Sequence, residues 1–326
     1  MTRHERPVTP APRRRRALRV LARCTLAAAA LVLLASALAA WRAGDYDRRI
    51  QRLPDALPAD PSTRPVEDPG ENWLLVGSDL RGVPAEGKWR PGRARSDTIM
   101  LLHVPENGRR ARVVSIPRDL WVEIPDGGPD AKINAAFSRG GPALLTATVE
   151  GLTDLRIDHV AVLDFAGFER MTDALGGVRI TLDRPIHDPT NGWSWPAGVN
   201  HLDGQSALRF VRERKGLSGS DLDRVERQQL FLRAMAEKAA SSGTLRNPFK
   251  LDAFLRAASE SLAVDSATEF GTLRALATRL ARIGPDRVDF ATMPNGSSSW
   301  IDGQSVVLQD RERAERFFTR LRSGSL

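Results

Sequence analysis

The sequence predicts an α/β domain in which one mixed β-sheet is covered by helices. Short apolar runs bounded by turn residues, such as residues 73–77 and 98–104, are typical of buried strands. From residue 72 onward these runs are mixed with segments of helical periodicity, which favours a single sheet with helical layers. The chain has 326 residues, 41% of them hydrophobic, and one cysteine. A chain of this size can be stabilised by its core without disulfide bonds.

The individual elements follow from local patterns. Strands are expected where apolar runs are short, and helices where apolar residues recur every three or four positions. The predicted strands cover residues 73–77, 98–104, 112–116, 120–124, 159–165, 178–182, 210–214 and 288–293. The predicted helices cover residues 141–152, 166–175, 254–264, 268–283 and 311–321, and a further helix begins after Ser220.

The net charge of +8 is located in the N-terminal tail. Residues 1–23 contain eight Arg and one Glu, a charge of +7, which leaves 8 − 7 = +1 for the rest of the chain. A nearly neutral main domain is not typical of a protein that binds nucleic acid over its fold. We therefore expect no nucleic-acid partner.

An apolar segment follows the basic tail. Residues 24–41 are 18 residues without a charge, about the length of a helix that crosses a bilayer. By the positive-inside rule, the preceding arginines place the N-terminus in the cytoplasm and the main domain outside the cell membrane. Residues 37–39 (Ala-Leu-Ala) offer a signal-peptidase site as the alternative, but Trp41 and Arg42 favour a retained single-pass anchor.

Recurring prolines in residues 42–71 predict an extended spacer of polyproline II type. The predicted organisation is a cytoplasmic tail (1–23), an anchor (24–41), a spacer (42–71), a core region (72–245) and a C-terminal segment (246–326) that completes the same extracytoplasmic domain.

Residues 209–229 are unusually rich in arginine. Because the guanidinium group binds phosphate oxygens in pairs, this composition favours a phosphate or pyrophosphate site. A strand at 210–214 would point alternate side chains to one face, and the start of the next helix favours an anion. The alternative is a solvated basic face. The residues expected to face the phosphate are Arg212, Arg214, Arg224, Arg227 and Gln228.

Charged residues also stand at the ends of three predicted strands, where ligands bind in open α/β sheets, although turn and cap roles are the alternative. Asp79 and Asp97 are two carboxylates that can hold a divalent ion such as Mg²⁺, which takes its other ligands from phosphate and water. A metal ion with arginines suits chemistry at phosphorus. The sequence has no P-loop, metal-type histidine pair or GxSxG motif, so nucleotide hydrolysis, zinc chemistry and serine esterase chemistry are poorly supported.

Several motifs occur in an order that resembles a known family. They are LLVGSDLR, RSDT, SIPRDLWVEIP, KINAAF, IDHVAVLDFAGF, MTDALGGV and VRERKG followed by RQQ. This string, roughly residues 72–238, is similar to the LytR-CpsA-Psr (LCP) family of membrane-anchored cell-envelope proteins. The Arg- and Ala-rich composition indicates the actinobacterial type.

The resemblance implies an α-β-α fold and the transfer of a glycopolymer from a polyprenyl (pyro)phosphate carrier to a peptidoglycan hydroxyl. It implies Mg²⁺, or Mn²⁺ in its place, on Asp79 and Asp97, with one of these aspartates as the base. The implied catalytic residues are Asp97, Asp79 and Arg118. The implied phosphate-binding residues are Arg81, Arg95, Arg118, Arg212, Arg214, Arg224, Arg227 and Gln228.

An apolar channel for the lipid is expected between sheet and helices. Residues 144–175 and 225–236 are its candidate walls, although apolar helix faces are usually core. Trp193 and Trp195 are candidate sugar platforms or packing anchors. Two alternative functions stay open, namely a polyprenyl-pyrophosphate hydrolase and a non-catalytic envelope-binding or regulatory protein.

Overall fold

The computed structural model describes residues 36–37, 40–79, 92, 94–213 and 221–326. It divides into two compact units, Met1–Asp45 and Tyr46–Leu326, and the elements below belong to the second unit. Within the described ranges, no helix has the length and apolar character needed to cross a membrane. Most of the predicted anchor, residues 24–41, lies outside the described residues.

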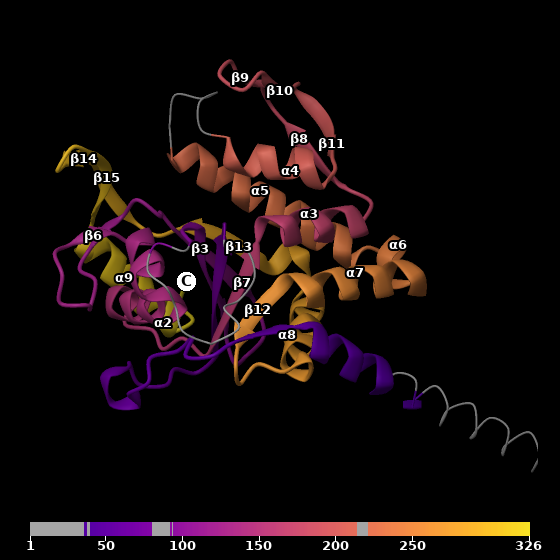
Figure 1. The fold of residues 1–326 in the computed structure, drawn as a ribbon, viewed down its shortest axis with the longest axis horizontal. Helices are drawn as coiled ribbons and strands as arrows, with labels where there is room; N and C mark the ends of the chain where they lie inside the picture. Colours follow the sequence, from indigo (N-terminus) through magenta and orange to yellow (C-terminus); the bar gives the residue numbers. More distant parts are fainter. Residues whose placement is uncertain (1–35, 38–39, 80–91, 93, 214–220) are drawn as a thin grey trace, which may run out of the picture. The chain divides into compact units, whose positions relative to one another are not determined.

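A seven-stranded mixed sheet forms the centre of the second unit (Figure 1). Three neighbouring pairs of strands run parallel and three run antiparallel. This arrangement confirms the predicted mixed sheet. In spatial order the strands are β1 (Gln51–Leu53), β12 (Leu262–Asp265), β7 (His159–Asp164), β2 (Glu71–Ser78), β3 (Ser96–Val104), β4 (Ala111–Ile116) and β13 (Val288–Thr292).

Helices cover both faces of the sheet, because successive side chains of each strand point to opposite faces. Leu74 and Val76 of β2 belong to the core that includes α2 and α9. Trp73 and Leu75 belong to the core beneath α8. Figure 1 shows α2 and α9 on one side of the sheet and α3, α7 and α8 on the other. These helices are α2 (Asn134–Thr153), α3 (Phe165–Ala174), α7 (Pro248–Ser261), α8 (Phe270–Ile283) and α9 (Arg311–Arg322).

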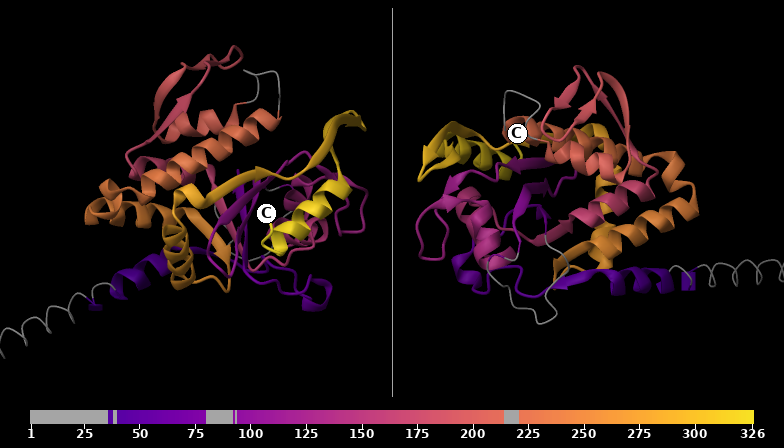
Figure 2. Two further views of the ribbon diagram at one scale, coloured as in Figure 1. Left: turned by 180° about the vertical axis from the view of Figure 1, so that it is seen from behind. Right: turned by 45° about the horizontal axis from the view of Figure 1, so that its top comes forward.

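A third apolar cluster forms where small β-ladders pack on α4 and α5. Figure 2 shows these elements standing together, away from the strands of the main sheet. They are β8 (Val178–Leu182), β9 (Ile186–Asp188), β10 (Trp193–Trp195), β11 (Gly198–Leu202), α4 (Gly204–Arg212) and α5 (Asp221–Ala240). The remaining elements are η1 (Pro61–Thr63), β5 (Trp121–Val122), β6 (Ala131–Lys132), α6 (Ser242–Leu245), η2 (Pro285–Arg287), β14 (Asn295–Ile301) and β15 (Gln304–Gln309).

The C-terminal part of the chain supplies strands to the central sheet. Residues 262–264, which were expected to end a helix, are the strand β12 instead, because Ala263 and Val264 are buried and pair with both β1 and β7. The strand β13 extends the opposite edge of the sheet beside β4.

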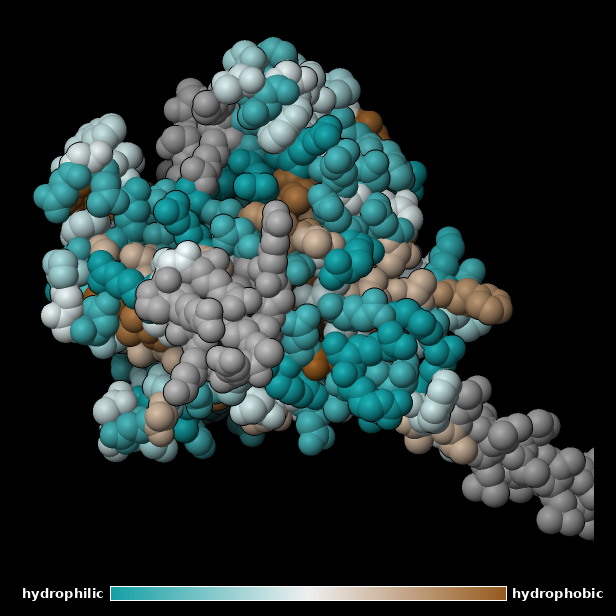
Figure 3. All heavy atoms as spheres, in the orientation of Figure 1, coloured by the Kyte–Doolittle hydropathy of each residue, from teal (hydrophilic) through white to brown (hydrophobic). Residues whose placement is uncertain are grey.

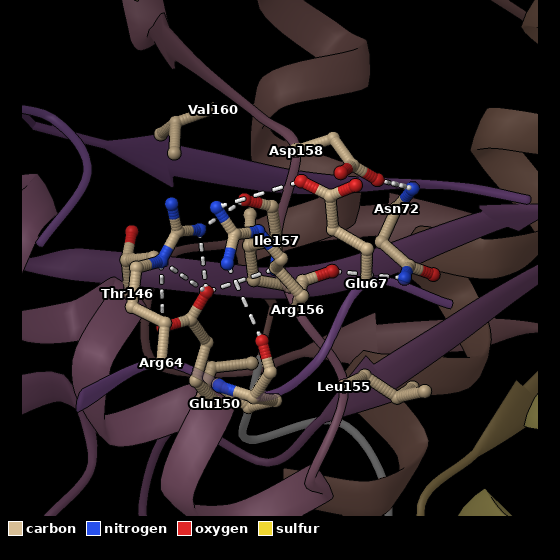
Figure 4. Close-up of polar contacts among 12 residues, drawn as sticks. Arg64, Glu67, Asn72, Thr146, Glu150, Leu155, Arg156, Ile157, Asp158 and Val160 are labelled. Carbon is tan, nitrogen blue, oxygen red and sulfur yellow. Dashed lines mark hydrogen bonds and ion pairs between the residues drawn. The ribbon is translucent and has the colours of Figure 1, made fainter. Parts of the chain in front are cut away.

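The predicted spacer is wrong for much of its length, because residues 51–64 pack in the domain. The strand β1 forms one edge of the central sheet, and Leu53 and Ala56 lie in a main core. Figure 4 shows how Arg64 reaches Glu150 of α2, with nitrogen–oxygen distances of 2.6 and 3.0 Å. Both side chains are buried. Proline spacing alone therefore misled the prediction, since the apolar residues between the prolines are used by the core.

Candidate functional site

The site lies at the edge of the sheet where β2 and β7 end and β3 begins. Gly77 pairs with Thr98, but Ser78 pairs with Ser96, so Asp97 is the extra residue of a β-bulge. A bulge interrupts the alternation of side chains and redirects one of them, and bulges are frequent next to active sites. The bulge thus sets the direction of the Asp97 carboxylate.

Asp97 forms an ion pair with Arg118, which follows the neighbouring strand β4. The side chains are 20% and 12% exposed, so the pair is largely shielded from water and still open on one side. Arg118 also lies 3.6 Å from Asp119, whose carboxylate contacts Lys132 at 3.2 Å. The structure thus brings together Asp97 and Arg118, two residues that were predicted from separate strand ends.

Asp79 and Arg95 meet at the same edge. The Oδ1 atom of Asp79 accepts a hydrogen bond of 2.7 Å from the backbone N–H of Arg95. The Ser78 hydroxyl donates to the Arg95 carbonyl at 2.9 Å, which fixes this turn further. The side chains of Asp79 and Arg95 are exposed. Arg81, which was predicted to join this set, lies outside the described residues.

Arg212 lies at the end of a helix, so the predicted strand at 210–214 is wrong. The helix α4 begins after Asp203, whose side chain accepts a hydrogen bond of 2.8 Å from the Ser206 N–H. This N-cap and the buried Ala207 and Phe210 select a helix, and they lie upstream of the short stretch from which a strand was inferred. The Arg212 guanidinium sits 4.5 Å from the ring centre of Phe165. Arg214 and the predicted cap Ser220 lie outside the described residues.

The three residues of α5 that were predicted to bind phosphate are buried rather than solvated. Arg224, Arg227 and Gln228 are each at most 9% exposed. Arg227 donates through Nη2 to the Glu213 carbonyl, and Gln228 donates to the Val211 carbonyl at 3.4 Å. Within the described part of the chain, Nε and Nη1 of Arg227 are buried and have no hydrogen-bond partner.

Burial lowers the pKa of Arg227, and the nearby carboxylates of Asp223 and Glu213 oppose that shift. A buried guanidinium with two nitrogen atoms that lack a partner among the described residues favours an anion nearby. The structure therefore does not support the alternative of a solvated basic face for these residues.

An apolar cavity of about 310 Å³ lies between the sheet and the helices α3, α4 and α5. Its polar lining side chains include Asp97, Arg212 and Gln228. Figure 3 shows hydrophobic side chains between hydrophilic ones in the region where Figure 1 labels α3 and α5. Other lining residues are Leu75, Met100, Leu163, Phe168, Met171, Leu208, Phe231, Leu232 and Met235. The expected walls at 225–236 and in α3 do line the cavity, whereas α2 packs on the opposite face of the sheet.

Sequence reasoning missed Asp164 and Phe165, at the end of β7. Asp164 caps α3, since its Oδ1 accepts a hydrogen bond of 2.5 Å from the Gly167 N–H, and it lines the cavity with Phe165. The signal was present in the sequence, because Asp164 ends a strand and Asp79 directly follows one. Of the two tryptophans proposed as sugar platforms, Trp195 is a packing anchor 5.5 Å from Phe210, and Trp193 stacks with Arg209.

The loop that follows β9 is fastened to the end of α4. Asp188 is buried and accepts hydrogen bonds from the N–H of Thr190 at 2.8 Å and from the Asn191 amide at 2.5 Å. Burial raises the pKa of Asp188, but its hydrogen bonds with the Glu213 side chain, with Asn191 and with the backbone outweigh this effect and lower the pKa to about 2. Glu213 thus contacts Asp188 through its side chain and Arg227 through its backbone carbonyl.

The carboxylates at this edge fit a magnesium ion only with help from a ligand. Among the residues that the structure describes, no three His, Cys, Asp or Glu side chains are grouped as a metal site. Asp79 and Asp97 lie at the same edge of the sheet. Asp79 binds the backbone N–H of Arg95, and Asp97 follows Arg95 by two residues. Mg²⁺ commonly takes one or two carboxylates and completes its shell with phosphate and water. The two aspartates match this number of carboxylates, and the magnesium site stays a prediction.

The comparison with protein families decides the family. The model of the LytR_cpsA_psr family matches residues 54–323. The chain belongs to this family. The match begins inside the predicted spacer, in agreement with the packing of residues 51–64.

Relatives and solved structures agree with this assignment. The probable cell wall biosynthesis protein LcpB of Corynebacterium glutamicum is 40% identical over 283 residues, covering 85% of this chain and 66% of LcpB. The polyisoprenyl-teichoic acid–peptidoglycan teichoic acid transferase TagU of Bacillus cereus is 34% identical over 172 residues, 53% of this chain and 54% of TagU. The chain thus spans about half to two thirds of these relatives. The LytR-Csp2A-Psr enzyme from Actinomyces oris matches with a TM-score of 0.66 at 20% identity, over 83% of this chain and 95% of that one, and shows the fold.

Proposed function

We propose that this protein transfers a phosphate-linked glycopolymer from a polyprenyl (pyro)phosphate carrier to a hydroxyl group of peptidoglycan. One observation carries the proposal: the apolar cavity of about 310 Å³ is bordered by Asp97, Arg212 and Gln228. A polyprenyl tail needs an apolar enclosure, and its phosphate needs hydrogen-bond donors at the end of that enclosure. The name of TagU describes a reaction of this kind.

The arginines supply the binding of the phosphate groups. Arg118 is held in place by Asp97, and Arg212 by the ring of Phe165. Arg227 contributes two buried N–H groups that have no partner among the described residues. Fixed donors of this kind stabilise negative charge on a phosphate without reorganising during the reaction. Arg95 and Arg224, with the undescribed Arg81 and Arg214, complete the proposed set.

The proposed step is a displacement at phosphorus. The acceptor hydroxyl oxygen forms a bond to the phosphorus that carries the glycopolymer, and the bond from this phosphorus to the bridging oxygen breaks. The polyprenyl phosphate leaves with that oxygen and its electron pair. The hydroxyl proton passes to the carboxylate of Asp97 or Asp79, which acts as general base.

A magnesium ion held by Asp79 and Asp97 would neutralise phosphate charge when it is bound. The residues of the chain bind and orient the donor in any case, because the arginine set and the apolar cavity do not depend on the metal. Mn²⁺ is the proposed substitute.

We further propose that the domain acts outside the cell membrane. Residues 24–41 are the proposed single-pass anchor, and the eight arginines before it keep the N-terminus in the cytoplasm. A membrane-anchored enzyme meets both its lipid-linked donor and the peptidoglycan acceptor at that location.

One assay tests the function. The full-length protein is mixed with Mg²⁺, peptidoglycan and a lipid-linked oligosaccharide that carries a label in its sugar. Label in the peptidoglycan supports the transferase. Release of the labelled sugar phosphate into solution supports a hydrolase, and recovery of intact donor on the protein supports a non-catalytic binding protein. Either of the last two results overturns the proposal.

A further inference from the structure

The N-terminal turn of α7 carries an exposed aromatic side chain beside basic residues. Phe249 is 84% exposed, more than any other aromatic side chain that the structure describes. Figure 3 shows a hydrophobic protrusion at the edge of the molecule where Figure 1 labels α6 and α7. Residues 238–256 contain four basic residues and one acidic residue, Asp252. The basic residues are Lys238, Arg246, Lys250 and Arg256.

This turn is held rigidly. The Oδ1 atom of Asn247 accepts hydrogen bonds from the N–H groups of Phe249 and Lys250, at 3.0 and 3.1 Å. Pro248 occupies the first position of the helix, where its fixed φ angle suits the helical backbone. Phe249 is therefore presented to solvent by an ordered helix start.

The same turn lies close to the point where the domain begins. The Tyr46 hydroxyl donates to Asp252 at 2.5 Å, and the Tyr46 ring lies 5.2 Å from that of Phe270. Asp252 is three residues after Phe249, so the two lie on neighbouring turns of one helix. Arg49 pairs with Glu260 at 2.5 Å and fastens the chain to α7 a second time.

The stretch between the proposed membrane span and Tyr46 is short. The proposed membrane span ends at Trp41, five residues earlier, and five residues reach at most about 18 Å even when fully extended. The surface that Tyr46 contacts is thus kept near the bilayer. An aromatic side chain among cations is the composition that favours the interface of an anionic membrane.

We propose that Phe249, with Arg246 and Lys250, forms a membrane-contact surface that docks the domain on an anionic bilayer. This inference rests on the proposed anchor. Docking would also fix the position of α7 relative to the bilayer. Leu262, directly after the other end of this helix, lines the apolar cavity. The start of α7 and Leu262 are separated by about 21 Å along the helix, the length of 14 helical residues.

Lipid-dependent fluorescence quenching tests the proposal on the full-length protein. The native Cys24 is the only cysteine, so a label can be placed there or, in a Cys24→Ser background, at Phe249→Cys or at Trp300→Cys. Trp300 of β14 is 75% exposed and serves as the matched control. The labelled proteins are reconstituted into phosphatidylglycerol vesicles whose lipids carry a nitroxide near the headgroup.

We expect the label at position 249 to lose about half of its emission or more, while the label at position 300 keeps its emission. Adding Arg246→Glu and Lys250→Glu should restore most of the emission at 249, since these changes reverse the attraction to the anionic lipid. Quenching at Cys24 without quenching at 249 overturns the inference and leaves the anchor intact. An absence of quenching at both Cys24 and position 249 overturns the anchor and the inference together. If the emission of the label at position 249 changes only at high protein concentration and does not respond to the nitroxide, the surface contacts a second copy of the protein. That result also overturns the inference.

Discussion

Two arginine–carboxylate pairs lie at opposite ends of the central sheet and differ in what surrounds them. Arg64 and Glu150, near the start of β2 and β7, are 8% and 4% exposed. Glu150 also accepts a hydrogen bond of 2.9 Å from the Ile157 N–H, and Arg64 donates to the Ile157 carbonyl. Arg118 and Asp97, at the other end, are more exposed and border an apolar cavity. The first pair is closed by protein groups, while the second is the pair at which we propose that a ligand binds.

The polar network at the structural end joins β2, β3 and the segment that precedes β7. Asn72 of β2 donates to the Asp158 side chain at 2.7 Å and to the Arg156 carbonyl at 2.9 Å (Figure 4). Its Oδ1 atom lies 2.8 Å from Nδ1 of His103 on β3. Because these groups contact one another and do not line the apolar cavity, we expect changes here to alter stability and to leave ligand binding unchanged.

Arg64→Ala tests the structural pair most severely. It leaves Glu150 buried without its partner, and we expect the free energy of unfolding to fall by about 3–5 kcal/mol. Urea unfolding of the detergent-solubilised protein measures this change. The double variant Arg64→Met with Glu150→Leu, which removes both charges, should regain much of the loss. A decrease below about 1 kcal/mol for Arg64→Ala would place the pair among ordinary surface ion pairs.

Asp97→Asn tests the ligand-facing pair. We expect the rate of transfer to fall by about 10²- to 10⁴-fold if Asp97 is the general base, with the lipid donor still bound. Asp79→Asn is the matched variant, since the sequence leaves open which aspartate takes the proton. Transfer rates with the labelled donor and donor binding are measured for both. Unchanged transfer in both variants would remove these aspartates from the mechanism.

Acid should weaken the structural end through His103. Burial and the nearby Arg112 lower its pKa from 6.5 to about 4. The unfolded chain therefore binds a proton between these pH values while the folded protein does not, so stability falls as the pH drops from about 6.5 to 4. The full loss is about 3 kcal/mol.

Thermal unfolding across this pH range measures the effect of His103. His103→Gln keeps a donor for Asn72 but does not titrate, so its stability should depend less steeply on pH. If the stability of both proteins depends equally steeply on pH, His103 does not contribute to the pH dependence.

Arg212→Ala should have the smallest effect of the four. Removing one charge-assisted contact typically costs about 1.5–3 kcal/mol, which corresponds to a 10- to 150-fold loss of affinity for polyprenyl pyrophosphate. Arg209→Ala is the control, because it removes the same charge one turn earlier, where Arg209 stacks on Trp193. Equal losses for both variants would indicate a general charge effect instead of a contact at Arg212.

Much of the fold was predictable because its signals are local. The buried strands β2 and β3 are short apolar runs, and β8 was predicted at residues 178–182, where the structure has it. The errors occurred where a local pattern competes with distant partners. A strand was predicted from the short stretch 210–214 (Phe-Val-Arg-Glu-Arg), yet the N-cap at Asp203 makes residues 210–212 the end of a helix. Residues 262–264 fit a helix pattern, yet they fill a place between two strands.

The sequence by itself determined the family, the mixed α/β architecture and the identity of the charged residues at the strand ends, because apolar periodicity and ordered motifs are written along the chain. Only the tertiary structure decided how these residues are used. The β-bulge at Asp97, the ion pair with Arg118 and the burial of Arg227 depend on strand register and helix packing between residues far apart in sequence. Register and packing are set by the whole core at once, so no local stretch specifies which arginine binds a ligand and which, like Arg64, closes the fold.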